Sequence, residues 1–322
     1  MSRVLGLDIG GTRSRARVCV DGEIVAEAEA ASASLTAAGM ASAAAALTDL
    51  LARLPADPGP PFDAVCAGSA GAEVPGARAF LHDHLAPLTR SGTVVVVNDA
   101  RLVLPAAGLD DGIAVICGTG SIAIGSCPGR EARAGGWGYL LGDEGSGYWI
   151  ARAAIRTLLD RRDRGAPPGE LGGRLAAAAG VPDTDALHKL FYDQPHPRYW
   201  AGYAPLVLDS ADPAAADITA EAARALAALA ASAAQRLAAP AGLPVVLAGG
   251  LMRHRALEAV TRHAIGEALP GSKIRTLTQP PVAGAVRLAE AAARSGGNPA
   301  RRGPGDRLPP RPTPAPPAAE PC

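Results

Sequence analysis

Residues 7–16 read LDIGGTRSRA, a run in which an apolar strand ends in Asp8, two glycines follow, and a second, alternating strand begins. Glycines in such a turn let backbone amides approach a phosphate without obstruction from a Cβ atom. The candidate phosphate-binding residues are therefore Gly10, Gly11, Thr12 and Arg13. Asp8 is a candidate ligand of Mg²⁺, held through water. Taken alone, the motif could be an ordinary glycine turn, so it needs a partner elsewhere in the chain.

A second segment supplies that partner. Residues 115–125 read VICGTGSIAIG, again a strand, a glycine turn with hydroxyl side chains and a strand. An actin-like ATPase holds the nucleotide phosphates between two such hairpins across an interdomain cleft. The candidate ATP-binding residues in this turn are Gly118, Thr119, Gly120 and Ser121. A third glycine turn, LAGGLMRH at 247–254, offers Gly249 and Gly250 to the adenosine, although the pattern also fits any connection between a strand and a helix.

The hydrophobic pattern around these turns predicts an α/β chain in two similar halves. Strands are expected at 4–9, 13–20, 63–68, 93–98, 113–118, 121–126, 244–248 and 273–276, and helices at 36–54, 76–87, 144–162, within 170–239 and at 282–294. We expect a two-lobed actin-like ATPase fold of the ribonuclease H-like class, in which each lobe is a mixed sheet with helices and the ligand cleft lies between the lobes. The expected lobes are 1–110 and 111–281, with a helical insertion in the second and helix 282–294 packing back onto the first. Residues 295–322 are Pro-rich and are expected to be disordered.

Composition excludes several classes of function. Lys plus Arg equals Asp plus Glu at 31 each in 322 residues, so no basic field is available to hold nucleic acid or an anionic membrane. The chain has neither a leader-like apolar segment at its start nor an apolar run of spanning length, which predicts a cytoplasmic location. Its five cysteines are scattered rather than paired as a zinc site or redox dithiol requires, so most are expected to be reduced core thiols.

Asp99 is the candidate catalytic base. It follows the apolar run TVVVVN at 93–98, and the carboxyl ends of strands in open α/β sheets carry groups that face ligands. In phosphoryl transfer such a carboxylate orients the accepting hydroxyl and takes its proton late, because the transition state is loose. The alternative is that Asp99 only caps the next helix.

The segment AGGWGYLLGDEGSGYWIARAAIR at 134–156 is dense in glycine, acidic and aromatic residues, which favours a ligand loop. With the two glycine turns, it resembles the N-acetylglucosamine kinase group within the BadF/BadG/BcrA/BcrD ATPase family, which includes the activators of benzoyl-CoA reductase and hydroxyacyl-CoA dehydratase. The resemblance extends over residues 4–156 and returns at 248–251 and 281–289.

The resemblance implies transfer of the ATP γ-phosphate to the 6-hydroxyl of N-acetylglucosamine, with Mg²⁺, by a homodimer. It implies that Asp99 is the base and that the sugar is contacted by Ser69, Thr119, Gly136, Trp137 and Asp143. Glu144 is interpreted as structural, and Tyr148 and Trp149 as core aromatics. Helix capping by Asp143, Glu144 or both is the alternative.

One departure from the family leaves the sugar open. Members often place an Asn in the loop after the third strand, whereas residues 31–40 read ASASLTAAGM; Ser34 or Thr36 could substitute. Glucosamine kinase and N-acetylmuramate kinase are therefore alternatives.

Two further alternatives belong to other classes. An ATP-driven activator would share an iron–sulfur cluster between subunits through two cysteines per chain. Cys117 directly precedes the GTGS turn, but Cys127 is the next cysteine and none occurs from 146 to 321. A non-catalytic sugar sensor would need a DNA-binding helix pair, for which a chain that opens directly in a strand leaves no room.

Overall fold

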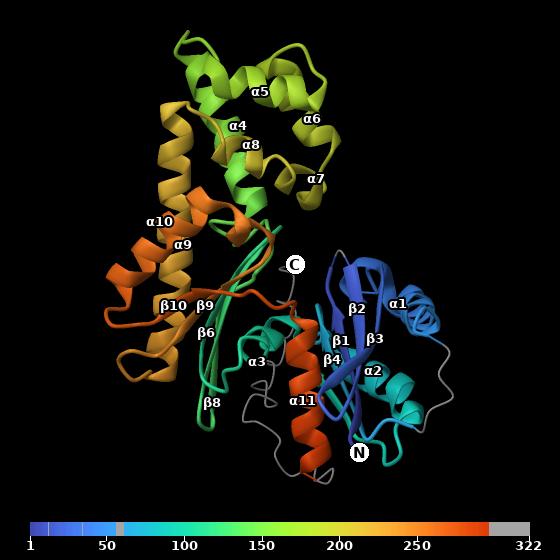
Figure 1. Cartoon of the computed structure of the whole chain (residues 1–322). Coiled ribbons are helices and arrows are strands. Elements are labelled where there is room, and N and C mark those ends of the chain that lie inside the picture. The colour runs from blue at the N-terminus through green and yellow to red at the C-terminus, as the bar shows by residue number, and fades with distance from the viewer. Residues whose placement is uncertain (12, 34, 56–60, 296–322) are drawn as a thin grey trace, which may run out of the picture.

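The computed structural model describes residues 1–11, 13–33, 35–55 and 61–295, which form two five-stranded sheets with helices (Figure 1). Among these residues, no helix is both long and apolar enough to cross a membrane. The segment 296–322, including the Pro-rich tail and Cys322, lies outside the described residues, as do Thr12 and Ser34.

The first sheet has the strand order β3-β2-β1-β4-β5. Its strands are β1 (Arg3–Ile9), β2 (Arg13–Val20), β3 (Glu23–Ala31), β4 (Ala64–Ser69) and β5 (Val94–Val97). The helical segments of this half are α1 (Leu35–Ala52), α2 (Ala77–Leu85), η1 (Ala86–Leu88), η2 (Asp99–Leu102) and α3 (Val103–Ala106). One face of the sheet packs against α1 and α2 through a core that includes Leu5, Leu7 and Ile9.

The second sheet has the order β10-β9-β6-β7-β8. Its strands are β6 (Gly112–Cys117), β7 (Ser121–Cys127), β8 (Arg130–Gly135), β9 (Val245–Ala248) and β10 (Ile274–Thr276). The helical segments are α4 (Gly147–Asp163), α5 (Gly169–Ala179), α6 (Thr184–Asp193), α7 (Pro197–Ala201), α8 (Ala204–Leu208), α9 (Pro213–Leu237), η3 (Gly250–Arg253) and α10 (Arg255–Ala268). Figure 1 shows α4–α8 as a helical layer beyond one end of this sheet, with α9 running from that layer along the strands.

The two sheets have the same topology. In the first, β1 pairs antiparallel with β2 and parallel with β4. In the second, β6 pairs antiparallel with β7 and parallel with β9. Read from β8 to β10, the second strand order repeats the first order read from β3 to β5. The expectation of mixed sheets with a repeated hairpin is therefore confirmed.

Helix α11 (Val282–Arg294) returns from the second half and packs on the face of the first sheet that α1 and α2 do not cover. The approach is close at two glycines: a Cβ at Gly6 would lie 2.7 Å from the Val286 amide nitrogen, and one at Gly284 would lie 2.0 Å from the Leu102 carbonyl oxygen. No larger residue fits either position without moving the backbone. The packing of α11 therefore depends on Gly6 and Gly284, neither of which was assigned a role from the sequence.

Candidate active site

Asp99 lies between the two halves of the molecule. It is the first residue of η2, directly after β5 and Asn98, and η2 contacts β1 and β4 of one sheet and β6 and β7 of the other. Asn98 is the residue that caps η2, because its side chain accepts a hydrogen bond from the Ala100 amide at 3.0 Å. The Asp99 carboxylate accepts from the same amide at 3.0 Å, so it shares the capping contact without being the cap residue.

Burial shifts the acidity of two carboxylates here. It raises the pKa of Asp99 to about 6, with the Ala100 hydrogen bond opposing the shift and the Glu73 charge adding to it. Burial also raises the pKa of Asp8 to about 7, where the neighbouring Asp99 carboxylate adds to the shift and Arg15 opposes it. A carboxylate whose ionisation is disfavoured by burial and by a neighbouring negative charge is one that a cation would stabilise. Among the described residues, no third His, Cys, Asp or Glu joins them in a metal-binding cluster.

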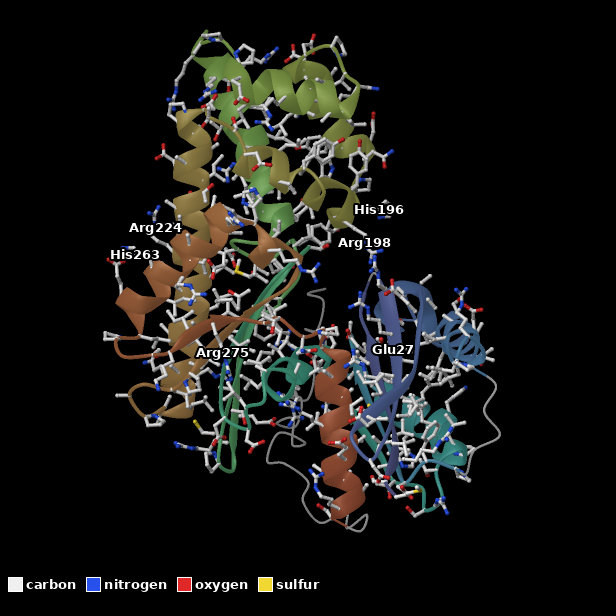
Figure 2. The ribbon with its side chains drawn as sticks, in the orientation of Figure 1. Glu27, His196, Arg198, Arg224, His263 and Arg275 are labelled. Atoms are coloured by element: carbon white, nitrogen blue, oxygen red, sulfur yellow. The ribbon has the colours of Figure 1, made fainter. Side chains whose placement is uncertain are left out.

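The first glycine turn, between β1 and β2, has several of its groups already engaged. The Gly10 amide donates to the Arg13 carbonyl at 3.1 Å, and the Arg13 guanidinium pairs with Glu29 at 2.8 Å. The carbonyl of Gly11 accepts a hydrogen bond from Arg198 of α7, a contact between the two halves (Figure 2). Thr12 is outside the described residues.

The second glycine turn, between β6 and β7, is enclosed by other loops. The Gly118 carbonyl accepts from the Gly147 amide at 2.8 Å, and the buried Ser121 hydroxyl donates to the Glu144 carbonyl at 2.7 Å. Gly249 has φ 97° at the end of β9, and a Cβ there would lie only 2.1 Å from the Cys117 carbonyl oxygen. The third glycine turn therefore lies directly against the second, while Thr119 and Gly120 keep partly exposed surface.

Asp143 is docked on the second turn. Its backbone is left-handed, with φ 61°, and a Cβ on Gly120 would lie 2.6 Å from its Oδ2 atom. Burial raises the pKa of Asp143, while hydrogen bonds from the Ser121 and Gly138 amides lower it. The cap of α4 is Ser146, so neither Asp143 nor Glu144 caps this helix.

The remaining expected sugar contacts differ in exposure. Trp137 is 67% exposed, and Gly136 beside it has φ 69°. Ser69, in contrast, has no exposed surface, and its hydroxyl donates to the Ala70 carbonyl at 3.2 Å. Ser69 ends β4, and its role as a sugar contact stays a prediction. Tyr148 and Trp149 pack in the core, as expected from the sequence.

Four polar residues at this site were not singled out from the sequence: Glu73, Asn98, Arg133 and Arg198. Glu73 follows the carboxyl end of β4 and accepts a hydrogen bond from the Asn98 side-chain amide at 2.7 Å. Arg133 of β8 lies 3.6 Å from Glu73 and 5.2 Å from the centre of the Trp137 ring. The position of Glu73 just beyond a buried strand is a signal that sequence reasoning could have used.

The cysteines of the described residues do not form a ligand set. Cys19, Cys66, Cys117 and Cys127 are free and buried. Cys117 donates to the Gly145 carbonyl at 3.3 Å, and burial raises the pKa of its thiol to about 12.

The sequence profile of the BadF/BadG/BcrA/BcrD ATPase family matches residues 5–289. Over 171 residues the chain is 34% identical to an N-acetylmuramic acid/N-acetylglucosamine kinase of Clostridium acetobutylicum. This alignment covers 51% of the chain and 56% of that protein. Over 120 residues it is 36% identical to an N-acetyl-D-glucosamine kinase of Dictyostelium discoideum, which covers 35% of the chain and 37% of that protein. The chain thus spans about half or less of the curated relatives that it matches.

The crystal structure of a candidate N-acetylglucosamine kinase from Chromobacterium violaceum superposes with a TM-score of 0.72. It is 27% identical in sequence, and the match covers 90% of this chain and 99% of that chain. Together with the two repeated mixed sheets, this likeness confirms the two-lobed actin-like ATPase fold expected from the sequence.

Proposed function

The chain belongs to the BadF/BadG/BcrA/BcrD ATPase family, and from this premise we propose that it is an ATP-dependent sugar kinase. The acceptor is an amino sugar, and the first candidate is N-acetylglucosamine, phosphorylated at its 6-hydroxyl. Two curated relatives and one structural neighbour carry N-acetylglucosamine in their names, which supports this choice of sugar.

One observation carries the proposal: the Asp99 carboxylate lies at the start of η2, the segment that contacts strands of both sheets. Each sheet contributes one glycine turn, so a base between them can meet a sugar from one side and a phosphate from the other.

Asp99 orients the sugar hydroxyl and accepts its proton as the γ-phosphate is transferred. The burial that raises its pKa to about 6 makes it a stronger base than an exposed Asp while leaving it ionised near neutral pH. Asp143, Gly136 and Trp137 bind the sugar, with Thr119 beside them. Gly10, Gly11 and the turn 118–121 hold the phosphates, and Gly249 with Gly250 packs the adenosine.

The residues present fit a magnesium ion. Burial and the Asp99 charge raise the free-energy cost of ionising Asp8, which a cation would offset. Mg²⁺ in phosphoryl-transfer sites typically takes one or two carboxylates together with the phosphates and water. Asp8 would hold the ion. When bound, Mg²⁺ neutralises the charge on the phosphate oxygens.

The choice among amino sugars depends on the groups around the acetamido position. Residues 31–40 contain no Asn, and Glu73, the carboxylate that accepts from Asn98, already pairs with Arg133. Free glucosamine would favour a carboxylate beside its ammonium group, whereas an acetylated sugar favours an amide partner, so the names of the relatives support N-acetylglucosamine as the first candidate. N-acetylmuramic acid stays a candidate, because one relative is named for both sugars.

The test is ADP release by the purified chain with ATP and Mg²⁺. The acceptors are N-acetylglucosamine, glucosamine, N-acetylmuramic acid, N-acetylmannosamine and glucose. We expect the strongest stimulation with N-acetylglucosamine and a product phosphorylated on the 6-hydroxyl, identified by phosphorus–proton NMR coupling. ATP hydrolysis that ignores every sugar, or the absence of any turnover, would exclude the kinase and favour an activator or a sugar sensor.

A further inference from the structure

Glu73 is fixed to the residue that precedes the proposed base. Its Oε1 atom accepts a hydrogen bond from Asn98 Nδ2 at 2.7 Å. Asn98 in turn caps η2 by accepting from the Ala100 amide at 3.0 Å. Glu73 therefore holds the side chain that begins η2, and Asp99 is the next residue.

Arg133 contacts the segment that carries the proposed sugar contacts. Its Nε atom donates to the Gly135 carbonyl at 3.2 Å, and its Nη2 atom donates to the Gly136 carbonyl at 2.5 Å. Its guanidinium carbon lies 5.2 Å from the centre of the Trp137 ring, within the range of a cation–π contact. One side chain thus fixes three consecutive residues of the loop that carries the proposed sugar contacts.

Glu73 and Arg133, which belong to different lobes, lie close to each other. Arg133 Nη1 lies 3.6 Å from Glu73 Oε1, joining the loop after β4 to β8. Two residues earlier on the same strand, Glu131 pairs with Arg101 of η2. Residues two apart in a strand point to the same face, so Glu131 and Arg133 lie side by side on β8. Each pairs with a residue of opposite charge in the first lobe.

We propose that Glu73 and Arg133 are positioning residues, an ion pair between the lobes that sets the sugar-binding loop at Gly136 and Trp137 relative to Asp99. The inference rests on the proposed sugar kinase function, because it assigns the pair to the sugar side of that site. Neither residue needs to touch the substrate; each acts through Asn98 or through the glycine loop.

A purely structural role does not account for the pair. Both side chains are partly exposed, at 44% for Glu73 and 35% for Arg133, and exposed ion pairs contribute little to stability. Their removal should therefore leave the unfolding temperature nearly unchanged while altering the loop and the use of the sugar. That separation distinguishes positioning from folding.

The experiment is a double-mutant cycle with Glu73→Gln, Arg133→Gln and the two combined. Gln at 73 keeps an oxygen that can accept from Asn98, so the substitution removes the charge and spares that hydrogen bond. We expect each single variant to lower kcat/KM for the sugar about tenfold, with KM for ATP unchanged, and the double variant to lose about the same tenfold rather than a hundredfold. Additive losses, or no loss, would overturn the pairing.

A second measurement needs no turnover. Hydrogen exchange of residues 134–142 in the free protein should quicken several-fold in both single variants, because the loop loses its link to the first lobe. The matched controls are Lys189→Gln and Asp193→Asn, which remove the charges of an exposed pair on α6. If exchange in Glu73→Gln equals that of the wild type, the inference is wrong even if the chain is a sugar kinase. If exchange quickens but no sugar is phosphorylated, the Glu73–Arg133 pair does hold the loop and the proposed kinase function is wrong.

Discussion

Asp99 combines three properties that suit a general base. It follows a strand end, it begins a segment that contacts both lobes, and burial raises its pKa to about 6. The position after the strand could be read from the sequence, because the run TVVVVN fixes where β5 ends. Its raised pKa could not, since desolvation depends on how η2 packs between the two sheets.

We expect Asp99→Asn to retain binding of sugar and nucleotide but to lose about 10²- to 10⁴-fold in kcat, the usual contribution of a general base. Asn has nearly the shape of Asp and can still accept from the Ala100 amide. Isothermal titration with the sugar and steady-state ADP release measure the two effects separately. An Asp99→Asn enzyme with near-normal kcat would mean that another group takes the proton.

Gly249 gives a second prediction at the scale of one residue. Its φ is 97°, and a Cβ atom at this position would lie 2.1 Å from the Cys117 carbonyl oxygen, which leaves no space for a side chain. Gly249→Ala should push β9 away from the second glycine turn and raise KM for ATP at least tenfold. Gly173→Ala on α5 is the matched control, because a Cβ there meets nothing within 4 Å and the residue is not part of the proposed site. Equal KM values for the two variants would contradict this explanation.

At the scale of elements, α4 and α9 are joined by one buried ion pair. Arg161, near the end of α4, donates to both carboxylate oxygens of Asp212, at 2.7 and 2.5 Å. Asp212 also caps α9 by accepting from the Ala214 amide at 3.0 Å, and its side chain is only 5% exposed. The helical layer therefore depends on Asp212, which was not singled out from the sequence.

Asp212→Ala should lower the free energy of unfolding by about 3–5 kcal/mol, because it leaves Arg161 unpaired and the helix without its cap. Asp212→Asn should cost less, about 2 kcal/mol, since Asn caps helices well but loses the charged pair with Arg161. Denaturant unfolding followed by circular dichroism compares the two. Equal losses would show that the cap contributes nothing measurable.

The same pair predicts a pH dependence of stability. Hydrogen bonds from Arg161 lower the pKa of Asp212 to about 2, below the ordinary value of 3.8. A carboxyl with a lowered pKa stabilises the fold above its unfolded pKa, so this contribution of about 2 kcal/mol is full at neutral pH and is lost as the pH falls from about 4 to 2. Unfolding midpoints of wild type and Asp212→Asn should converge over that interval. Parallel curves would contradict the assignment.

At the scale of the whole molecule, contacts between the lobes lie on both sides of the proposed site. Glu73–Arg133 and Arg101–Glu131 join the first lobe to β8, and Arg198 joins α7 to the first glycine turn. The last contact links residues 187 positions apart in the chain. It places α7 over the turn proposed to bind the phosphates.

Arg198→Ala should raise KM for ATP about fivefold, the equivalent of one hydrogen bond of about 1 kcal/mol, and leave KM for the sugar unchanged. The reason is that Arg198 holds the Gly11 carbonyl and hence the backbone of the phosphate turn. Lys189→Ala on the adjoining helix α6, exposed and paired only along its own helix in the described structure, controls for loss of a positive charge. A rise in KM for the sugar instead would show that Arg198 acts on sugar binding and would contradict this prediction.

Three features could be predicted from the residues alone: the repeated strand–turn–strand pattern, the mixed character of both sheets and the place of Asp99 after an apolar strand. These features are local: periodicity and glycine turns act within about ten residues of one another. Tertiary packing, in contrast, sets the burial of Ser69, the contact of Asp143 with Gly120 and the approach of Glu73 to Arg133. These outcomes depend on how two lobes, each folded by its own local pattern, pack against each other, and no spacing along the chain encodes that distance.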